Sequence, residues 1–186
     1  MKKVVILASG SGTLARAIFA AEKDYKIAAL ICDRPQAKVI ETANEFDIKV
    51  ELLELIDDRT KWDQELLSLV SKYQPALVVS AGFMRILSPK IVERFKVINS
   101  HPSLLPLFPG AHAVRDALAT GATESGTTIH WVDAGLDTGQ VIAQERLDIL
   151  ESDTEESLHE RIKILERGLI VATIAQILSN MEKTNG

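Results

Sequence analysis

The chain has 186 residues, of which 46% are hydrophobic and 25% are charged, and its formal net charge is −5. Lysine and arginine form no block or stripe, which argues against a nucleic-acid partner, and no apolar run approaches the ~20 residues that cross a membrane. The apolar stretch near the N-terminus is too short for a secretory signal, and the single cysteine, Cys32, permits no internal disulfide. We therefore expect a globular cytoplasmic protein that acts on small molecules.

Short apolar runs alternate with longer amphipathic segments along the first hundred residues. The apolar runs predict strands at residues 4–8, 27–32, 49–53, 76–81 and 96–99. The segments between them predict helices at residues 13–23, 36–46, 60–74 and 88–94. This alternation predicts right-handed βαβ units, and so a Rossmann-like α/β fold with a mainly parallel sheet and helices on both faces.

The second half of the chain begins with a proline-rich loop, followed by a predicted helix at residues 111–120. Two further strands are predicted at residues 126–132 and 140–149, where they can form a hairpin. A long helix comes last, and the sequence SDTE at residues 152–155 fits a capping box at its start. Apolar side chains then recur at steps of three and four and predict a helix lying on a core, at Leu158, Ile162, Leu165, Leu169 and Ala172.

A glycine-rich loop, ASGSGTLARAI, joins the first strand to the first helix. Gly10, Gly12 and Ala15 fit the spacing G-x-G-x-x-G/A, and Asp33 closes the second strand about 20 residues later. Glycines allow close backbone approach, and the start of a helix offers free N–H groups to a phosphate. The pattern favours a phosphate site. Alternatives are a tight turn without a ligand and, through Asp33, a nicotinamide dinucleotide site.

The segment VINSHPSLLPLFPGAH places Asn99 and His101 two residues apart at the end of a predicted strand. Residues two apart in a strand point to the same side, and open α/β sheets bind ligands at the carboxyl ends of their strands. An Asn amide can donate to a developing oxyanion, and a His can carry a proton near neutral pH. The two residues are therefore candidate catalytic groups, although a loop histidine can also simply bond the backbone.

A second polar cluster, VDAGLDTGQ at residues 132–140, contains Asp133 and Asp137. A carboxylate here can orient an imidazole and favour its protonated form, or it can simply hold a turn through backbone N–H groups. We favour the turn for Asp133, and the sequence alone does not decide for Asp137. His130 is interpreted as a structural core histidine and His159 as a helix-surface residue. The histidines and the cysteine show no metal-ligand spacing.

The motifs NSHPSLLPLFPGAHA, SAGFMRILSP and VDAGLDTGQVI, behind the SGSGT loop, resemble those of the glycinamide ribonucleotide formyltransferases. The resemblance covers almost the whole chain and implies a single formyltransferase-fold domain at residues 1–186. Residues 1–100 would form a nucleotide-binding βαβ half, and residues 101–186 would supply the catalytic loop, the hairpin and the C-terminal helix. It implies formyl transfer from 10-formyltetrahydrofolate to glycinamide ribonucleotide in purine biosynthesis, without a metal, by a monomer or homodimer.

The resemblance assigns catalysis to Asn99, His101 and Asp137. The substrate amine would attack the formyl carbon, Asn99 and protonated His101 would stabilise the oxyanion, and Asp137 would keep the imidazole charged and aimed. It also favours a cis peptide at Leu105–Pro106.

The resemblance further assigns the nucleotide to Gly12, Thr13, Leu14 and Glu166. Many relatives carry Asn where this chain has Leu14, so only backbone contacts are expected there. The remaining assigned residues would contact 10-formyltetrahydrofolate: Arg59, Met84, Arg85, Ile86, Leu87, Asn99, Asp133, Ala134, Gly135, Leu136 and Asp137.

Other functions fit parts of the sequence. A nicotinamide-dependent oxidoreductase would explain the glycine loop and Asp33 but not the NSHPSLLP segment. A non-catalytic folate- or nucleotide-binding protein would not need Asn99, His101 and Asp137 together. The methionyl-tRNA formyltransferases share LDTG but usually have Gly after the His and an added C-terminal domain. A formyltetrahydrofolate hydrolase usually carries an extra N-terminal domain.

Overall fold

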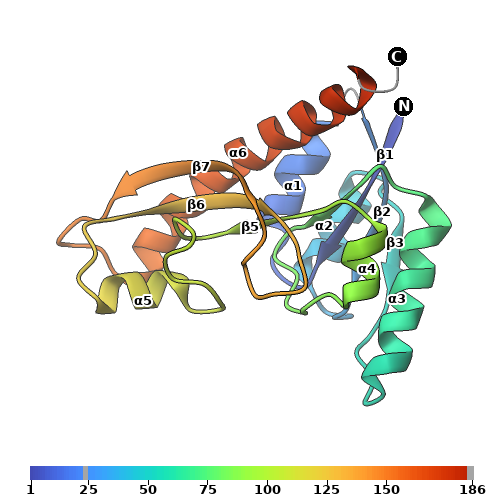
Figure 1. The fold of residues 1–186 in the computed structure, drawn as a ribbon, viewed down its shortest axis with the longest axis horizontal. Coiled ribbons are helices and arrows are strands. Elements are labelled where there is room, and N and C mark those ends of the chain that lie inside the picture. Colours follow the sequence, from blue (N-terminus) through green and yellow to red (C-terminus); the bar gives the residue numbers. More distant parts are fainter. Residues whose placement is uncertain (23–24, 184–186) are drawn as a thin grey trace.

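The computed structural model describes residues 1–22 and 25–183, and within them it contains a seven-stranded sheet in the order β3-β2-β1-β4-β5-β6-β7 (Figure 1). In chain order the strands are β1 (Lys2–Ala8), β2 (Tyr25–Cys32), β3 (Val50–Leu52), β4 (Leu77–Ser80), β5 (Val97–His101), β6 (Glu124–Trp131) and β7 (Val141–Asp148). The pairs among β1 to β5 are parallel, whereas β6 pairs antiparallel with both β5 and β7. The mainly parallel sheet and the hairpin are therefore confirmed.

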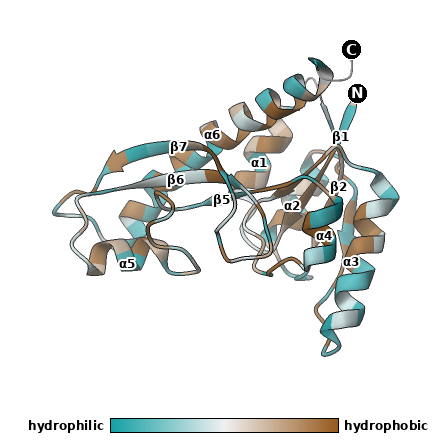
Figure 2. Cartoon of the chain, viewed as in Figure 1, coloured by the Kyte–Doolittle hydropathy of each residue, from teal (hydrophilic) through white to brown (hydrophobic). Residues whose placement is uncertain are grey.

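Helices cover both faces of this sheet, as predicted. In chain order they are α1 (Thr13–Ala20), α2 (Lys38–Glu45), α3 (Arg59–Tyr73), α4 (Pro89–Arg94), α5 (Ala113–Ala119) and α6 (Glu155–Lys183). One apolar core lies between the sheet and α1, α2 and α6, and a second lies between the sheet and α3 and α4. Figure 2 shows hydrophobic residues along the central strands and on the sides of the helices that face them. The central strands are apolar on both sides because each side contacts a core.

The connection between α1 and β2 differs from the prediction of a helix at residues 13–23. The helix ends at Ala20, and β2 begins at Tyr25 instead of residue 27. The Tyr25 side chain is buried and donates to the carbonyl of Ile18, while the Glu22 carboxylate accepts the N–H of Ile27 at 2.9 Å. Burial of Tyr25 thus starts the strand early. Residue 23 lies outside the described residues.

The buried side of α6 also differs from the predicted stripe. Its buried positions include a series at steps of four residues: Leu158, Ile162, Glu166, Ile170 and Ile174. Ala172 is exposed and Leu165 is only partly buried, so these two predicted core positions were wrong, whereas Leu169 is partly buried and packs against the core as predicted. A series of four-residue steps turns slowly around the helix and here follows the sheet beneath it. As a result, a charged residue, Glu166, lies on the buried side.

The capping box at the start of α6 lies two residues later than predicted. The Thr154 Oγ1 accepts the N–H of Ser157 at 3.1 Å, and the Ser157 Oγ accepts the N–H of Thr154 at 2.9 Å. The helix begins at Glu155, so Thr154 and not Ser152 is the N-cap residue.

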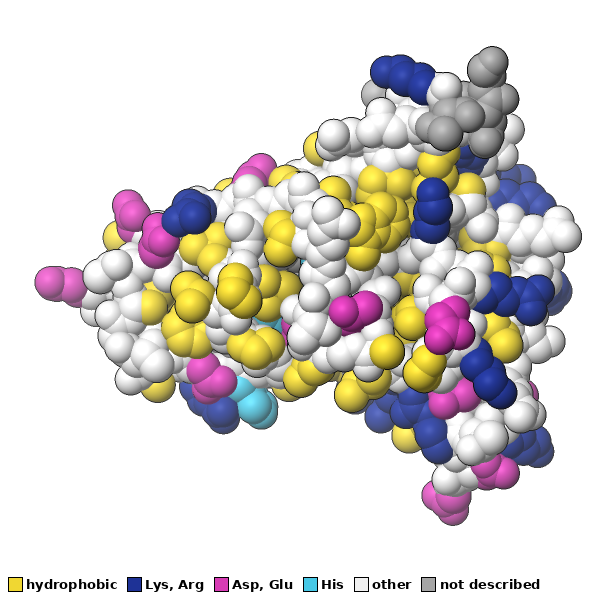
Figure 3. Space-filling model, viewed as in Figure 1, with side chains coloured by type: hydrophobic (Ala, Val, Ile, Leu, Met, Phe, Trp, Pro, Cys, Tyr) yellow, Lys and Arg dark blue, Asp and Glu magenta, His cyan; other side chains and the backbone are white. Residues whose placement is uncertain are grey.

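The surface shown in Figure 3 carries basic side chains among acidic ones, with hydrophobic side chains between them. This face shows no continuous basic stripe, in agreement with the sequence. None of the described helices is both long enough and apolar enough to cross a membrane.

Gly12 is required for the fold at the start of α1. Its φ is 78°, in the left-handed region, and an added Cβ would lie 2.7 Å from the Cα of Val39 in α2. The N–H of Val39 also donates to the carbonyl of Gly10 at 3.2 Å. Gly12 therefore allows the backbone of the glycine loop to lie close to α2. The sequence pattern had explained the same glycine by the close approach of a ligand.

We expect Gly12→Ala to lower the free energy of unfolding by about 2–5 kcal/mol, the sum of a left-handed alanine and an overpacked contact. Chemical denaturation measures this change. Gly10→Ala is the control, because an added Cβ at Gly10 meets no atom of the described residues within 4 Å. Equal losses in the two variants would contradict the packing role of Gly12.

Candidate active site

A cleft of about 640 Å³ opens at the carboxyl ends of β1, β4 and β5. Segments far apart in the chain line it, including residues 10–14, residues 80–87, the end of β5, the loop after β6 and one side of α6. This is the edge at which open α/β sheets bind ligands. Almost all of the predicted site residues line this cleft, and the exceptions are Arg59 and Ala134.

Asn99, His101 and Asp137 come together in the cleft, joined by His130. The Asp137 Oδ2 lies 3.4 Å from the His101 Nδ1, and the Asp137 Oδ1 lies 3.5 Å from the His130 Nε2. The Asn99 Nδ2 lies 3.3 Å from the same His130 nitrogen, and the Gly110 N–H donates to Asp137 at 2.8 Å. One carboxylate thus contacts two imidazoles and a backbone amide.

The sequence interpretation of His130 as a core histidine was incomplete. Its side chain is buried, but it faces the cleft and contacts both Asn99 and Asp137. The antiparallel register of β5 and β6 places His130 directly opposite Asn99. In the sequence, His130 was marked by its place in the alternating side-chain pattern of β6. Such a pattern does not show which residue of β5 lies opposite His130.

His101 is held through both ring nitrogens. Its Nδ1 faces Asp137, and its Nε2 lies 2.8 Å from the carbonyl oxygen of Phe108. Both contacts are with acceptor oxygens, so each nitrogen has a partner for its proton when the imidazole is charged.

The loop after β5 is fixed by hydrogen bonds to β6 and β7. The Thr128 Oγ1 donates to the Ser103 carbonyl at 2.6 Å and accepts the Leu105 N–H at 3.1 Å. Gln144 of β7 donates to the Leu105 carbonyl at 2.8 Å. The Leu105–Pro106 peptide is cis, as the resemblance implied.

Asp137 remains a carboxylate in a largely buried position. Burial alone would raise its pKa, but the hydrogen bond with His130, the Gly110 N–H and the neighbouring His101 together hold the pKa below its ordinary value. Its φ of 54° lies in the left-handed region, so its backbone is constrained as well as its side chain.

The residues expected to hold the nucleotide lie at one end of the cleft. Gly12, Thr13 and Leu14 line it, but the Leu14 side chain also packs on the core beside α1, α2 and α6. Glu166 is buried, and its Oε1 accepts the Ser100 hydroxyl at 2.7 Å. Lys163, one turn before Glu166, also lines the cleft. The sequence interpretation missed it, although its position three residues before Glu166 places both side chains on the same side of the helix.

His159 lines the same side of the cleft, one turn before Lys163. It is half-buried, so the prediction of a surface residue was wrong. Burial and the neighbouring Lys163 lower the pKa of this histidine.

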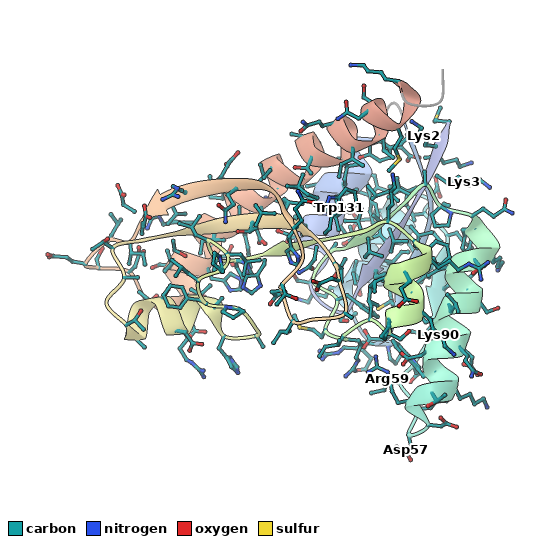
Figure 4. All side chains as sticks on the ribbon, in the orientation of Figure 1. Lys2, Lys3, Asp57, Arg59, Lys90 and Trp131 are labelled. Atoms are coloured by element: carbon teal, nitrogen blue, oxygen red, sulfur yellow. The ribbon has the colours of Figure 1, made fainter. Side chains whose placement is uncertain are left out.

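The stretch expected to hold the folate, residues 84–87, forms a rim of the cleft after β4. This rim adjoins the start of the glycine loop, because the Met84 N–H donates to the Ser9 Oγ at 2.9 Å. Arg59, labelled near the start of α3 in Figure 4, donates to the Ile86 carbonyl and pairs with Asp63 at 2.8 Å. Its guanidinium lies 5.0 Å from the centre of the Trp62 ring. Arg59 therefore supports the rim from α3 and does not line the cleft.

The loop after β6 contains the remaining predicted residues. Asp133 accepts the Gly135 N–H at 3.0 Å and the Thr138 hydroxyl at 2.8 Å, which is the turn role that the sequence favoured. Gly135 and Leu136 line the cleft, whereas Ala134 is exposed outside it.

Arg85 and Asp33 form a buried ion pair between the rim and β2. The Arg85 Nε lies 2.6 Å from the Asp33 Oδ2, and the Asp33 side chain is 1% exposed. The other oxygen, Oδ1, has no hydrogen-bond partner among the described residues. Asp33 is thus covered by Arg85, and its carboxylate is not presented to a ribose. This removes the main sequence argument for a nicotinamide cofactor.

Among the described residues, no group of three or more His, Cys, Asp or Glu side chains is placed to hold a metal ion.

A buried Asn–His–Asp cluster in a cleft at the carboxyl ends of parallel strands is the arrangement of an α/β enzyme. Residues 2–174 match the formyl transferase family, and the chain belongs to that family. Over 185 residues it is 45% identical to the phosphoribosylglycinamide formyltransferase of Mycobacterium tuberculosis, covering 96% of this chain and 86% of the relative. The Bacillus subtilis enzyme of the same name is 39% identical over 186 residues, with 96% and 95% covered.

Solved structures agree with this assignment. Glycinamide ribonucleotide transformylase 1 from Geobacillus kaustophilus aligns with a TM-score of 0.91 at 37% identity, covering 96% of this chain and 99% of that chain. The phosphoribosylglycinamide formyltransferase of Bacillus halodurans aligns with a TM-score of 0.90 at 40% identity, covering 96% of each chain.

Removing Arg85 should destabilise the fold whether or not Arg85 contacts a ligand. Arg85→Ala removes both the counter-charge and part of the cover of the Asp33 carboxylate, which we expect to cost about 1–3 kcal/mol of unfolding free energy because water can then reach the carboxylate. Arg59→Ala is the control, and its exposed pair with Asp63 should contribute about 1 kcal/mol or less. Urea denaturation compares the two, and a loss below 1 kcal/mol for Arg85→Ala would refute the structural role.

The lowered pKa of Asp137 predicts a pH-dependent contribution to stability. A depressed pKa stabilises the fold above the unfolded value, roughly 3.9, and this contribution is lost as the pH falls through the folded value. The difference in unfolding free energy between the wild type and Asp137→Asn should therefore shrink between pH 5 and pH 3. Asp133→Asn, in the same loop but exposed, is the control. A difference for Asp137→Asn that stays constant with pH would contradict this reading.

Proposed function

We propose that the protein transfers a formyl group from 10-formyltetrahydrofolate to the primary amine of glycinamide ribonucleotide, a step of purine biosynthesis. The observation that carries this proposal is the cluster of Asn99, His101 and Asp137 in a cleft that the glycine loop and residues 84–87 also line. The names of the similar enzymes and structures support the same reaction.

The end of the cleft beside α1 suits a monophosphate nucleotide. The first N–H groups of α1, the Ser11 and Thr13 hydroxyls and the Lys163 ammonium are donors for a 5′-phosphate. Leu14 would contribute only its backbone, because its side chain packs on the core. Glu166, deeper along α6, would accept hydrogen bonds from the ribose hydroxyls.

The rim formed by residues 84–87 suits the flat ring system of a folate. Met84, Ile86 and Leu136 are exposed apolar side chains there, at 60%, 61% and 53%. Backbone groups of residues 84–87 and of residues 133–137 would form hydrogen bonds with the polar edges of the ring system. Arg59 would act by holding the Ile86 carbonyl, and Arg85 by anchoring the rim to Asp33.

The cluster can stabilise the charge that develops when the amine attacks the formyl carbon. The Asn99 amide and the protonated His101 would donate to the oxyanion, and Asp137 would hold the imidazole through Nδ1. A new carbon–nitrogen bond forms to the substrate amine, the bond to the folate nitrogen breaks, and one proton passes from amine to folate nitrogen through His101 or a water. The Phe108 carbonyl must release the His101 Nε2 before that nitrogen can face the substrate.

The assignment divides the single domain, residues 1–186, into two cooperating halves. Residues 1–100 would supply the phosphate loop, the folate rim and the strand that carries Asn99. Residues 101–186 would supply His101, Asp137 and Glu166. We expect the enzyme to act in the cytoplasm on small-molecule substrates, as a monomer or homodimer, without a metal.

We expect His101→Ala and Asn99→Ala each to lower turnover by about a hundredfold or more, the usual effect of losing a proton-transfer group or an oxyanion donor. The KM for glycinamide ribonucleotide should change much less. Release of tetrahydrofolate is the assay, run with and without glycinamide ribonucleotide. His112→Ala is the matched control, because His112 is exposed at the start of α5.

Two results would overturn the proposed function. Near-full activity in both Asn99→Ala and His101→Ala would exclude the mechanism. Equal folate release without the nucleotide would favour a hydrolase.

A further inference from the structure

Ser100 lies between the two catalytic candidates but points away from them. In β5 the side chains of Asn99 and His101 face the Asp137 cluster, whereas Ser100 faces α6. Its hydroxyl donates to the Glu166 Oε1 at 2.7 Å and lies 3.3 Å from the Thr127 Oγ1. Ser100 also lines the cleft. A single strand residue therefore joins β5 to the carboxylate on α6.

The Glu166 carboxyl is under opposing influences. Its residue is 8% exposed, and this burial raises its pKa above the ordinary value. The hydrogen bond from Ser100 and the nearby charges of Lys163 and Arg167 act in the opposite direction, with Ser100 the largest of the three. Ser100 therefore favours the ionised form of this carboxyl.

We propose that Ser100 is a positioning residue for nucleotide recognition, because its hydrogen bond turns the Glu166 carboxyl group so that it accepts both hydroxyls of a ribose cis-diol. This inference rests on the proposed function, since it assumes that the nucleotide lies between the glycine loop and α6. Ser100 acts through Glu166 and need not touch the reacting atoms.

The chemistry of a diol explains why the ionised form matters. Two neighbouring hydroxyls offer two protons, and a carboxylate accepts both because it has no proton of its own. A protonated carboxyl group carries a proton of its own that needs an acceptor, so it can accept fewer hydrogen bonds from the two ribose hydroxyls. Ser100 occupies one acceptor position of Oε1 and leaves the rest of the carboxylate for the ribose.

Ser100 also fixes the expected ribose site relative to β5, the strand that carries Asn99 and His101. The Thr127 Oγ1, next to Ser100, donates to the His101 carbonyl at 3.3 Å. Ser100, which is hydrogen-bonded to Glu166, is also the chain neighbour of both Asn99 and His101 in β5. A nucleotide held by Glu166 is therefore placed at a fixed offset from Asn99 and His101.

Other groups near Glu166 also titrate, so the test must compare variants. On α6, Lys163, Arg167 and His159 are the charged or titratable neighbours, and across the cleft lie His101, His130 and Asp137. The hydroxyls of Ser100 and Thr127 lie beside Glu166 and Ser100 respectively, and Ser11 and Thr13 of the glycine loop line the same cleft. The charged groups are identical in the wild type and in Ser100→Ala, so a difference between these two proteins reports on the hydroxyl.

The experiment measures binding of glycinamide ribonucleotide by calorimetry from pH 5 to pH 8, without folate, so no turnover occurs. We expect Ser100→Ala to weaken binding about tenfold at neutral pH, the usual effect of losing a hydrogen bond to a charged group. The acidic limb, where affinity falls as Glu166 is protonated, should move to higher pH by about one unit. Ser100→Thr should restore both properties.

A second ligand tests the specificity. The 2′,3′-dideoxy analogue of the nucleotide should bind the wild type more weakly than the parent does, and this difference should shrink in Ser100→Ala. Ser125→Ala is the matched control, because Ser125 is buried in the same sheet and its hydroxyl has no partner in the described part of the chain. It should bind both ligands as the wild type does.

The outcomes separate this inference from the proposed function. If the wild type does not bind glycinamide ribonucleotide, the proposed function fails. If the wild type binds it, but Ser100→Ala binds with the same affinity and the same acidic limb, only the role of Ser100 is refuted. Weaker binding without a shift of the limb, and without rescue by Ser100→Thr, would also refute it, because this is the pattern of a structural defect.

Discussion

Three consecutive polar residues at the end of a buried strand are the constraint on which the site depends. Buried polar groups need hydrogen-bond partners, and Asn99, Ser100 and His101 each find theirs in a different part of the chain. Asn99 contacts β6, Ser100 contacts α6, and His101 contacts the two loops that carry Phe108 and Asp137. The hydrogen-bond partners that these three side chains need therefore bring four distant segments of the chain around one cleft.

Buried carboxylates around this cleft are neutralised in different ways, which separates their roles. Asp33 meets a guanidinium and serves the fold. Asp137 meets two imidazoles and an amide, and Glu166 meets a hydroxyl beside more distant cations. Asp33 does not line the cleft, whereas the carboxylates of Asp137 and Glu166 do. Acidic side chains thus serve the fold at Asp33, and they belong to polar clusters of the cleft at Asp137 and Glu166.

The sequence predicted those features that depend on local periodicity. The alternation of strands and helices, the hairpin, and the shared side of Asn99 and His101 all follow from steps of two or about four residues. Features that depend on pairing between distant segments were not predictable in this way. His130 enters the site through the register of β5 and β6, and Gly12 is fixed by a contact with Val39.

Glu166 shows the same limit within a single helix. The resemblance named it, and its position four residues after Ile162 allows it to lie over the apolar stripe or in solvent. The direction in which α6 crosses the sheet decides between these, and Glu166 is buried. Arg85 is the converse case: the motif indicated a ligand contact, and the buried Asp33 beneath it accounts for the residue structurally.

The length of α6 has a consequence for how the enzyme admits its substrates. At 29 residues the helix is about 44 Å long, and it packs on α1 at one part and on α5, β6 and β7 at another (Figure 1). One continuous helix therefore contacts both the parallel part of the sheet and the hairpin and holds the two together. Rotation of one half against the other would have to bend this helix or separate it from one of these elements. The helix therefore opposes a hinge motion that would widen the cleft for the substrates.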